Sequence, residues 1–152
     1  MKQTTLCYIE KDGAYLMLHR VKKENDMNKD KWIGIGGKFK AGETPFDCAR
    51  REIHEETGLF AKSLIYKGIV TFVSDEFGTE YMHLFKVTDI AGDLKTNCDE
   101  GVLEWVKKDK ILDLPHWEGD KYFLELLDSD VPFFSMKLCY SGSTLTDHTI
   151  EY

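Results

Sequence analysis

Apolar residues recur along the chain in short segments separated by turn residues, a pattern that predicts strands. Residues 4–9 and 14–19 flank a Lys-Asp-Gly turn, as two neighbouring strands would. Further strand-like segments occur at 61–73, 81–88, 104–107, 133–140 and 144–152. A Ser-Gly-Ser turn separates the last two. The chain is therefore expected to be rich in strands.

Two segments have the features of helices instead. In residues 44–57, Thr44 suits the N-cap, Pro45 suits the first helical position, and Gly58 suits the C-terminal cap. The second segment, 120–127, has helical apolar spacing at Phe123, Leu124 and Leu127. We therefore expect one helix in the middle of the chain and one near its end.

The predicted elements follow the order strands, helix, strands, helix, strands. This order is typical of the α/β class with a mixed β-sheet packed between α-helices. Residues 22–31 are polar and predict a surface loop, and residues 32–39, with three glycines, predict a short strand and a tight turn. The 152 residues contain no repeat or linker, so a single domain is expected over residues 1–152.

The composition argues against several classes of protein. A net charge of −7 without a basic run disfavours sequence-independent binding to DNA or RNA, which depends on Lys and Arg. An anionic substrate would need positive charge from elsewhere, and a divalent metal ion would supply it. No apolar run reaches the length of a membrane span. No secretion signal is evident in the start, MKQTTLCYIE, so a cytoplasmic protein is expected.

The four cysteines and five histidines are scattered along the chain. Without a CxxC pair or a His/Cys cluster, a zinc site is not expected. The even number of cysteines leaves disulfides open, although the absence of an export signal favours reduced thiols.

The predicted helix at 44–57 carries a cluster of carboxylates. At 100° per residue, its apolar stripe comprises Phe46, Ala49 and Ile53. The neighbouring face carries Glu52, Glu55 and Glu56. Like charges at this spacing destabilise a helix by roughly 0.2–0.5 kcal/mol each, and the helix dipole disfavours them near the C-terminus. A bound Mg²⁺ or Mn²⁺ would explain the cluster; a solvated acidic face is the alternative.

The surrounding sequence resembles the signature of the Nudix hydrolases, Gx5Ex7REUxEExGU, where U is a bulky aliphatic residue. Every fixed position matches, at Gly37, Glu43, Arg51, Glu52, Ile53, Glu55, Glu56, Gly58 and Leu59. A chance match at these positions is of order 10⁻⁹ per window. The resemblance implies the Nudix fold and cleavage of a diphosphate linkage in a nucleotide-like substrate.

The same resemblance implies roles for particular residues. The ligands of Mg²⁺, or of Mn²⁺ as a substitute, would be the backbone carbonyl of Gly36 and the side chains of Glu52, Glu55 and Glu56. Arg51 would pair with Glu43 and hold the loop against the helix, the alternative being a surface ion pair of little energetic value. Glu43 would otherwise organise the metal shell.

Nearly the whole chain resembles the 8-oxo-dGTP diphosphatases of the MutT/MutX-like branch, through WIGIGGKFKAGETPFDCARREIHEETGL, EGVLEW, PHWEGDKYF and PFFSMKLCYSG. These enzymes cleave oxidised purine triphosphates to the monophosphate and pyrophosphate. Glu100 would then be a further acidic ligand or the general base, against the alternative of a loop carboxylate. Glu55 is the other candidate base. The substrate-binding residues would be Trp117, Asp120, Ile33, Gly37 and Lys38, with a purely structural role in the core as the alternative for Trp117.

Two departures bear on the substrate. Ile33 stands where the human-type enzymes carry an Asn that contacts the base, and Gly119 precedes Asp120 where they carry two adjacent acids. The alternatives are a Nudix hydrolase of an ordinary dNTP, ADP-ribose, a dinucleoside polyphosphate or capped RNA, and a non-catalytic nucleotide-binding module. The expected partner is a small-molecule nucleotide, not a nucleic acid polymer or a membrane, and the chain is expected to be a monomer or homodimer. The C-terminal hairpin would either cover the pocket or complete the sheet.

Overall fold

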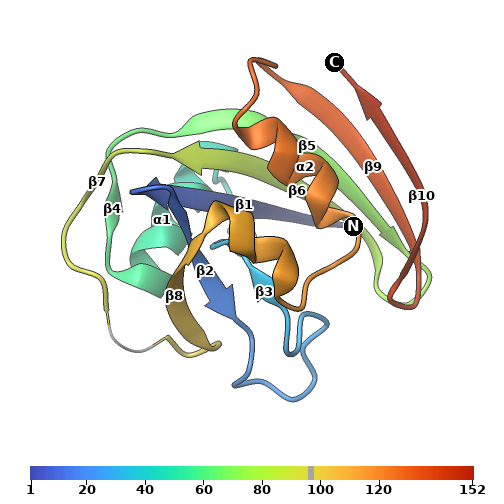
Figure 1. Cartoon of the computed structure of the whole chain (residues 1–152), viewed down its shortest axis with the longest axis horizontal. Coiled ribbons are helices and arrows are strands. Elements are labelled where there is room, and N and C mark those ends of the chain that lie inside the picture. The colour runs from blue at the N-terminus through green and yellow to red at the C-terminus, as the bar shows by residue number, and fades with distance from the viewer. Residues whose placement is uncertain (96–97) are drawn as a thin grey trace.

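The computed structural model describes residues 1–95 and 98–152 and is centred on a mixed β-sheet (Figure 1). Among these residues, eight strands form the sheet in the spatial order β10-β9-β5-β6-β1-β2-β3, with β8 also paired to β2. Their bounds are β1 Lys2–Lys11, β2 Ala14–His19, β3 Trp32–Ile33, β5 Ile65–Ser74, β6 Gly78–Val87, β8 Val102–Lys107, β9 Phe134–Ser141 and β10 Thr144–Glu151. β1 runs parallel to β6 and β5 runs parallel to β9, whereas the other pairs are antiparallel.

Helix α1 (Pro45–Thr57) begins and ends where the sequence predicts. The Thr44 side chain accepts a hydrogen bond from the Asp47 N–H at 3.1 Å, and the Asp47 carboxylate accepts one from the Thr44 N–H at 3.0 Å. This reciprocal capping box satisfies backbone donors that the first turn leaves unpaired. Gly58 ends the helix at φ 80°, a left-handed conformation that suits glycine. Local interactions therefore fix both ends of the helix that carries the carboxylates.

The sheet separates two apolar clusters, because successive strand residues point to opposite faces. In β1, Tyr8 belongs to one cluster and Ile9 to the other. Helix α2 (Asp120–Leu127) packs on the first cluster through Phe123, and α1 packs on the second through Ile53. The predicted α/β arrangement of a mixed sheet between helices is confirmed.

Some predicted segments differ from the observed elements. The strand expected at 61–73 is interrupted, because β4 (Phe60–Ala61) pairs with β7 (Ile90–Ala91) in a separate two-stranded sheet. The 3-10 helix η1 (Lys108–Asp113) has no counterpart in the prediction, since six residues are too few to establish a helical period. The short strand expected within 32–39 is present as β3, but the tight turn expected after it is not, because the backbone runs along β1 with isolated bridges from Ile35 to Cys7 and from Lys38 to Thr4.

The C-terminal hairpin of β9 and β10 has two roles in the fold. β9 pairs with β5, so the hairpin extends the sheet. The Tyr140 hydroxyl accepts a hydrogen bond from the Gly119 N–H at 2.7 Å, and Leu138 lines the main cavity. The hairpin therefore completes the sheet and also contributes to the cavity wall.

The structure also bears on covalent links and membrane insertion. The four cysteines are free, with Cys7, Cys48 and Cys98 buried and Cys139 half-buried. In the part of the chain that the structure describes, no helix is long and apolar enough to cross a lipid bilayer.

Candidate active site

The glycine-rich loop at 34–38 lies directly against β1 and α1. The Thr5 N–H donates to the Gly37 carbonyl at 2.9 Å. A Cβ atom on Gly36 would come within 1.8 Å of the Thr5 carbonyl oxygen, and one on Gly37 would come within 2.6 Å of the Glu52 carboxylate carbon. Only glycine lets the loop backbone approach the strand and the helix this closely.

The three glutamates of α1 lie in different environments. Glu56 is buried, and its Oε2 accepts a hydrogen bond from the Gly36 N–H at 3.2 Å. The Glu52 side chain is 14% exposed, whereas that of Glu55 is 52% exposed. The structure therefore excludes a uniformly solvated acidic face, because two of the three carboxylates lie against the glycine-rich loop.

Arg51 ties α1 to the preceding loop. Its guanidinium donates to both carboxylate oxygens of Glu43, at 2.7 and 2.9 Å, and to the Lys38 carbonyl at 3.0 Å. It also donates to Glu52 at 2.7 Å and to Glu55 at 3.1 Å. The expected pair with Glu43 is present, and it is a largely enclosed two-point contact. Hydrogen bonding from Arg51 is the main cause that lowers the pKa of Glu43 to about 2.

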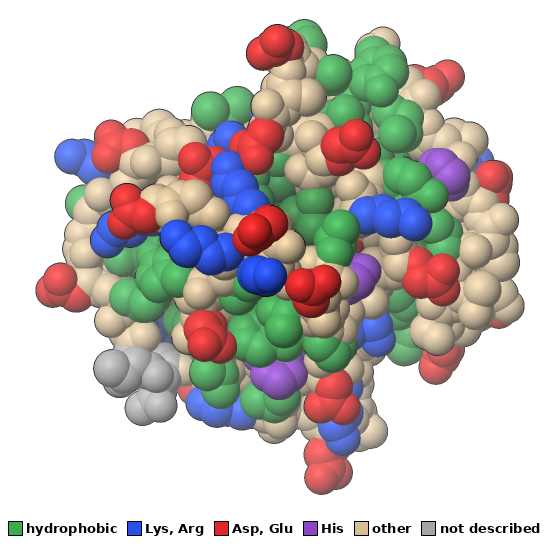
Figure 2. Space-filling model, viewed as in Figure 1, with side chains coloured by type: hydrophobic (Ala, Val, Ile, Leu, Met, Phe, Trp, Pro, Cys, Tyr) green, Lys and Arg blue, Asp and Glu red, His purple; other side chains and the backbone are tan. Residues whose placement is uncertain are grey.

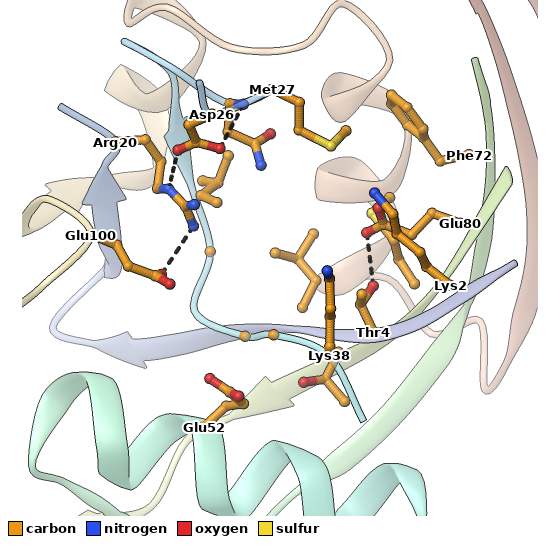
Figure 3. Close-up of a pocket in the computed structure, with 18 of the residues that line it drawn as sticks. Lys2, Thr4, Arg20, Asp26, Met27, Lys38, Glu52, Phe72, Glu80 and Glu100 are labelled. Carbon is orange, nitrogen blue, oxygen red and sulfur yellow. Dashed lines mark hydrogen bonds and ion pairs between the residues drawn. The ribbon is translucent and has the colours of Figure 1, made fainter. Parts of the chain in front are cut away.

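Glu100 reaches the same region from the segment before β8. Arg20 donates to its Oε2 at 3.0 Å, and the Lys23 Nζ lies 3.6 Å from its Oε1 (Figure 3). Its carboxylate is close enough to Glu56 to raise the pKa of that group. The fold therefore brings Glu100 to the carboxylates of α1, although it lies far from them in the sequence.

The electrostatics of this end of the site favour a cation. Burial raises the pKa of Glu56 well above its usual range, and the nearby Glu100 and Glu52 raise it further. Burial also raises the pKa of Glu52, although Arg51 opposes that effect. An opposite charge among these groups would favour their ionised forms and remove much of the repulsion between them.

A cavity of about 850 Å³ extends from Glu52, Glu55 and Glu100 to an aromatic pocket, whereas the buried Glu56 does not line it (Figure 3). Its volume is typical of small-molecule sites. In Figure 3, Glu52 lies at one end of the cavity, and Met27 and Phe72 project into the other end from different walls. All five substrate-binding residues expected from the sequence line this cavity, namely Ile33, Gly37, Lys38, Trp117 and Asp120.

Trp117 is both a core residue and a wall of the cavity. The residue is 6% exposed, and its ring makes edge contacts with Phe72 and Tyr140, at centroid distances of 5.1 and 5.0 Å. The indole Nε1 donates to the Asn28 Oδ1 at 2.8 Å. Trp117 is therefore buried as a core residue would be. It also forms part of the cavity wall, where a ligand could contact it.

Asp120 is a buried carboxyl at the start of α2. Burial raises its pKa to about 7, although a hydrogen bond from the Trp117 backbone and the charge of Lys31 act in the opposite direction. Near neutral pH both protonation states of Asp120 are therefore populated. The group can accept a hydrogen bond in either state and donate one when protonated.

The loop at 22–31 forms a wall that sequence reasoning missed. Asp26 pairs with Arg20 at 2.6 Å, Met27 packs on the apolar cluster around Trp117, and Asn28 bonds the Trp117 indole. The predicted loop is present, but residues 26–28 are half-buried, because their side chains contact Arg20, the apolar cluster and Trp117. The apolar Met27 in a polar segment is the one sequence feature that indicates an inward position.

Comparison with known proteins places this arrangement in a family. The family model described as the NUDIX domain matches residues 2–127. The chain belongs to the Nudix family. As a Nudix hydrolase, the protein acts on pyrophosphate bonds of small nucleotides, and Nudix hydrolases generally use a divalent metal ion.

Individual relatives of this Nudix hydrolase cover most of its length. The oxidized purine nucleoside triphosphate hydrolase of Mus musculus is 34% identical over 109 residues, which span 69% of this chain and 67% of that protein. The protein of the same name from Danio rerio is 29% identical over 154 residues, spanning 99% of this chain and 94% of that protein. The crystal structure of the mutator MutT protein from Bacillus halodurans matches with a TM-score of 0.87 and 29% identity, over 99% of this chain and 98% of that chain.

Proposed function

We propose that this Nudix hydrolase is a Mg²⁺-dependent pyrophosphohydrolase that converts oxidised purine nucleoside triphosphates, above all 8-oxo-dGTP, to the monophosphate and pyrophosphate. The observation that carries the proposal is the continuous cavity, which has carboxylates at one end and Trp117 with Asp120 at the other. Two relatives named as oxidized purine nucleoside triphosphate hydrolases support it.

The donor set beside the glycine-rich loop suits a hard divalent cation. The metal would be held by Glu52, Glu55, Glu56 and the Gly36 carbonyl. Among the described residues, no three His, Cys, Asp or Glu side chains already form a metal shell. Arg51 bonds one oxygen of Glu52, Oε1, and one oxygen of Glu55, Oε2. The second oxygen of each carboxylate does not bond Arg51 and would be the one offered to the cation.

When bound, Mg²⁺ supplies positive charge to the phosphate oxygens and lowers the pKa of a coordinated water. The chain itself positions the substrate and accepts the proton. Lys38 lines the cavity and offers its ammonium group to the triphosphate, whereas Lys2 lines it beside Glu80 (Figure 3). Glu55 and Glu100 also line the cavity, which supports them as the two candidate proton acceptors.

The base end of the cavity supports an oxidised guanine. Guanine presents N7 as a hydrogen-bond acceptor, whereas 8-oxoguanine carries a proton on N7 and presents a donor there. The ionised form of Asp120 accepts from such an N–H and repels a bare acceptor. Trp117 offers a ring for stacking. Ile33, in contrast, provides only apolar contact, so the polar recognition falls to other residues.

The distribution of charge supports a small nucleotide over a nucleic acid polymer. On the face shown in Figure 2, Lys and Arg side chains are interspersed with Asp and Glu and are not gathered into a basic area. A polymer backbone requires a continuous row of basic groups. A triphosphate in the cavity requires only the local cations and the metal.

Pyrophosphate release, with Mg²⁺ or with EDTA, tests the proposal across 8-oxo-dGTP, dGTP, the other dNTPs, ADP-ribose and diadenosine polyphosphates. We expect Mg²⁺-dependent turnover with the highest kcat/KM for 8-oxo-dGTP. A different preferred substrate would retain the chemistry and reject the oxidised purine. Absence of turnover on the whole panel would favour a nucleotide-binding module.

A further inference from the structure

We infer that Asn28 determines base specificity by donating a hydrogen bond from its side-chain amino group to a carbonyl oxygen of the purine. The inference rests on the proposed function in one respect, namely that a purine occupies the Trp117 end of the cavity. Asn28 lines this cavity together with Trp117, Asp120 and Ile33.

The hydrogen bond to Trp117 fixes which way the amide of Asn28 faces. An indole N–H is only a donor, so its partner at 2.8 Å must be the amide oxygen of Asn28. The amino group then points away from Trp117. Within the described residues this amino group has no hydrogen-bond partner, and Asn28 is one of the residues that line the cavity, so its N–H donors can serve a molecule bound there.

The backbone of Asn28 is held at both sides. Its N–H donates to the Asp26 Oδ1 at 3.0 Å, and its carbonyl accepts from the Lys31 N–H at 2.9 Å. Asp26 is in turn paired with Arg20 at 2.6 Å, and both side chains are largely buried. Arg20 also bonds Glu100, so a chain of contacts runs from the carboxylate end of the cavity to Asn28 (Figure 3). A donor held in this way is positioned before a ligand arrives, which favours specific binding.

The two polar groups at this end of the cavity complement a guanine-type base. Asn28 offers N–H donors, and Asp120 offers a carboxyl that accepts. A guanine-type base has a carbonyl oxygen at C6, whereas adenine has an amino group there. The adenine amino group would face the Asn28 donors without forming a hydrogen bond. Since Ile33 offers only apolar contact, the Asn28 amino group supplies hydrogen-bond donors beside Trp117 and favours oxopurines over aminopurines.

Calorimetric titration of the protein with dGMP, 8-oxo-dGMP and dAMP tests this inference without turnover or metal. The wild type is expected to bind the two guanine nucleotides more tightly than dAMP. Asn28→Asp keeps the acceptor for Trp117 and the side-chain volume, but it replaces the amino group with an oxygen. The preference for dGMP over dAMP, as a ratio of Kd values, should then fall roughly 10- to 100-fold.

Asn25→Asp is the matched control, because Asn25 lines the same cavity from the same loop and the substitution adds the same charge. It should weaken all three nucleotides together and leave their ratio unchanged. The inference is overturned if wild-type dAMP binds as tightly as dGMP. It is also overturned if Asn28→Asp leaves the ratio unchanged or if both variants shift it equally. A shifted ratio in a protein that prefers dGTP to 8-oxo-dGTP in turnover would retain Asn28 and reject the proposed substrate.

Discussion

Glu56 lies almost fully buried beside Glu52 and Glu100, and this arrangement costs free energy when no cation is present. Its hydrogen bond with the Gly36 N–H recovers only part of that cost. Folding holds the carboxylate there because packing of α1 on the sheet determines the position of every residue on the helix. The residue is therefore suited to a bound metal and poorly suited to stabilising the metal-free protein.

Glu56→Gln should abolish nearly all turnover and leave the fold intact. The glutamine keeps an oxygen that can accept from Gly36 but has no charge for a cation, so we expect kcat/KM to fall on the order of 10³-fold or more. In EDTA, the Tm of the variant should equal or exceed that of the wild type, because a buried carboxyl is removed. Pyrophosphate release and calorimetric unfolding measure the two effects, with the exposed Glu125→Gln as control. Unchanged turnover would rule out Glu56 as a ligand.

At the scale of elements, the site is the junction of β1, the loop at 34–38 and α1. The loop contacts the strand through its backbone and contacts the helix through Glu52 and Glu56. Arg51 and Glu43 close the junction from the helix side. Gly36 faces the backbone of Thr5, whereas Gly37 faces the side chain of Glu52. Substitution of Gly36 should therefore lower mainly stability, and substitution of Gly37 should lower mainly activity.

Gly36→Ala should destabilise the protein by about 2–4 kcal/mol, because its methyl group meets the backbone of Thr5 at 1.8 Å and cannot be accommodated without moving the strand or the loop. Gly37→Ala meets only the end of the Glu52 side chain, which can rotate away. Its free energy of unfolding should change by less than about 1 kcal/mol, while kcat/KM falls at least roughly 10-fold as Glu52 leaves its position. Urea unfolding and pyrophosphate release distinguish the two variants. Equal loss of stability in both would contradict this assignment.

At the scale of the whole molecule, the cavity is assembled from segments that lie far apart in the sequence, from Lys2 to Leu138. Its base end combines β1, the loop at 22–31, the start of α2 and β9. Asp120 is buried where these parts meet, and its pKa of about 7 reflects their combined exclusion of water. The titration of Asp120 therefore reports on the intact cavity.

Stability should fall as the pH rises through the range between the two pKa values of Asp120. The unfolded chain releases this proton near pH 4, whereas the folded protein retains it to about pH 7. Between these values the unfolded state binds fewer protons, so each rise in pH favours unfolding. Asp120→Asn removes the ionisable group and with it this loss of stability. The free energy of unfolding of the variant minus that of the wild type should therefore increase from pH 4 to pH 7, by up to about 4 kcal/mol, and then level off.

Chemical unfolding of Asp120→Asn and the wild type at a series of pH values measures this difference. Glu125→Gln, an exposed carboxylate on the same helix, controls for the change in net charge. A pH-independent difference for Asp120→Asn would show that Asp120 ionises in the folded protein as it does in the unfolded chain.

The sequence by itself determined the features that depend on neighbouring residues. The bounds of α1 follow from Thr44, Pro45 and Gly58, because capping involves residues within one turn. The common side of Glu52 and Glu56 follows from the helical period. The order of strands and helices indicated the α/β class, and the spacing of the fixed residues indicated the family.

Only the tertiary structure decided how the site is enclosed. It showed that Glu56 is buried while Glu55 is exposed, and that Glu100 lies beside them. It also turned the polar loop at 22–31 into a cavity wall, through the contact of Asn28 with Trp117. These contacts join residues far apart in the chain, and they depend on strand pairing and on the packing of α2. No local period or cap encodes them, because the same residues would be exposed in the absence of the rest of the fold.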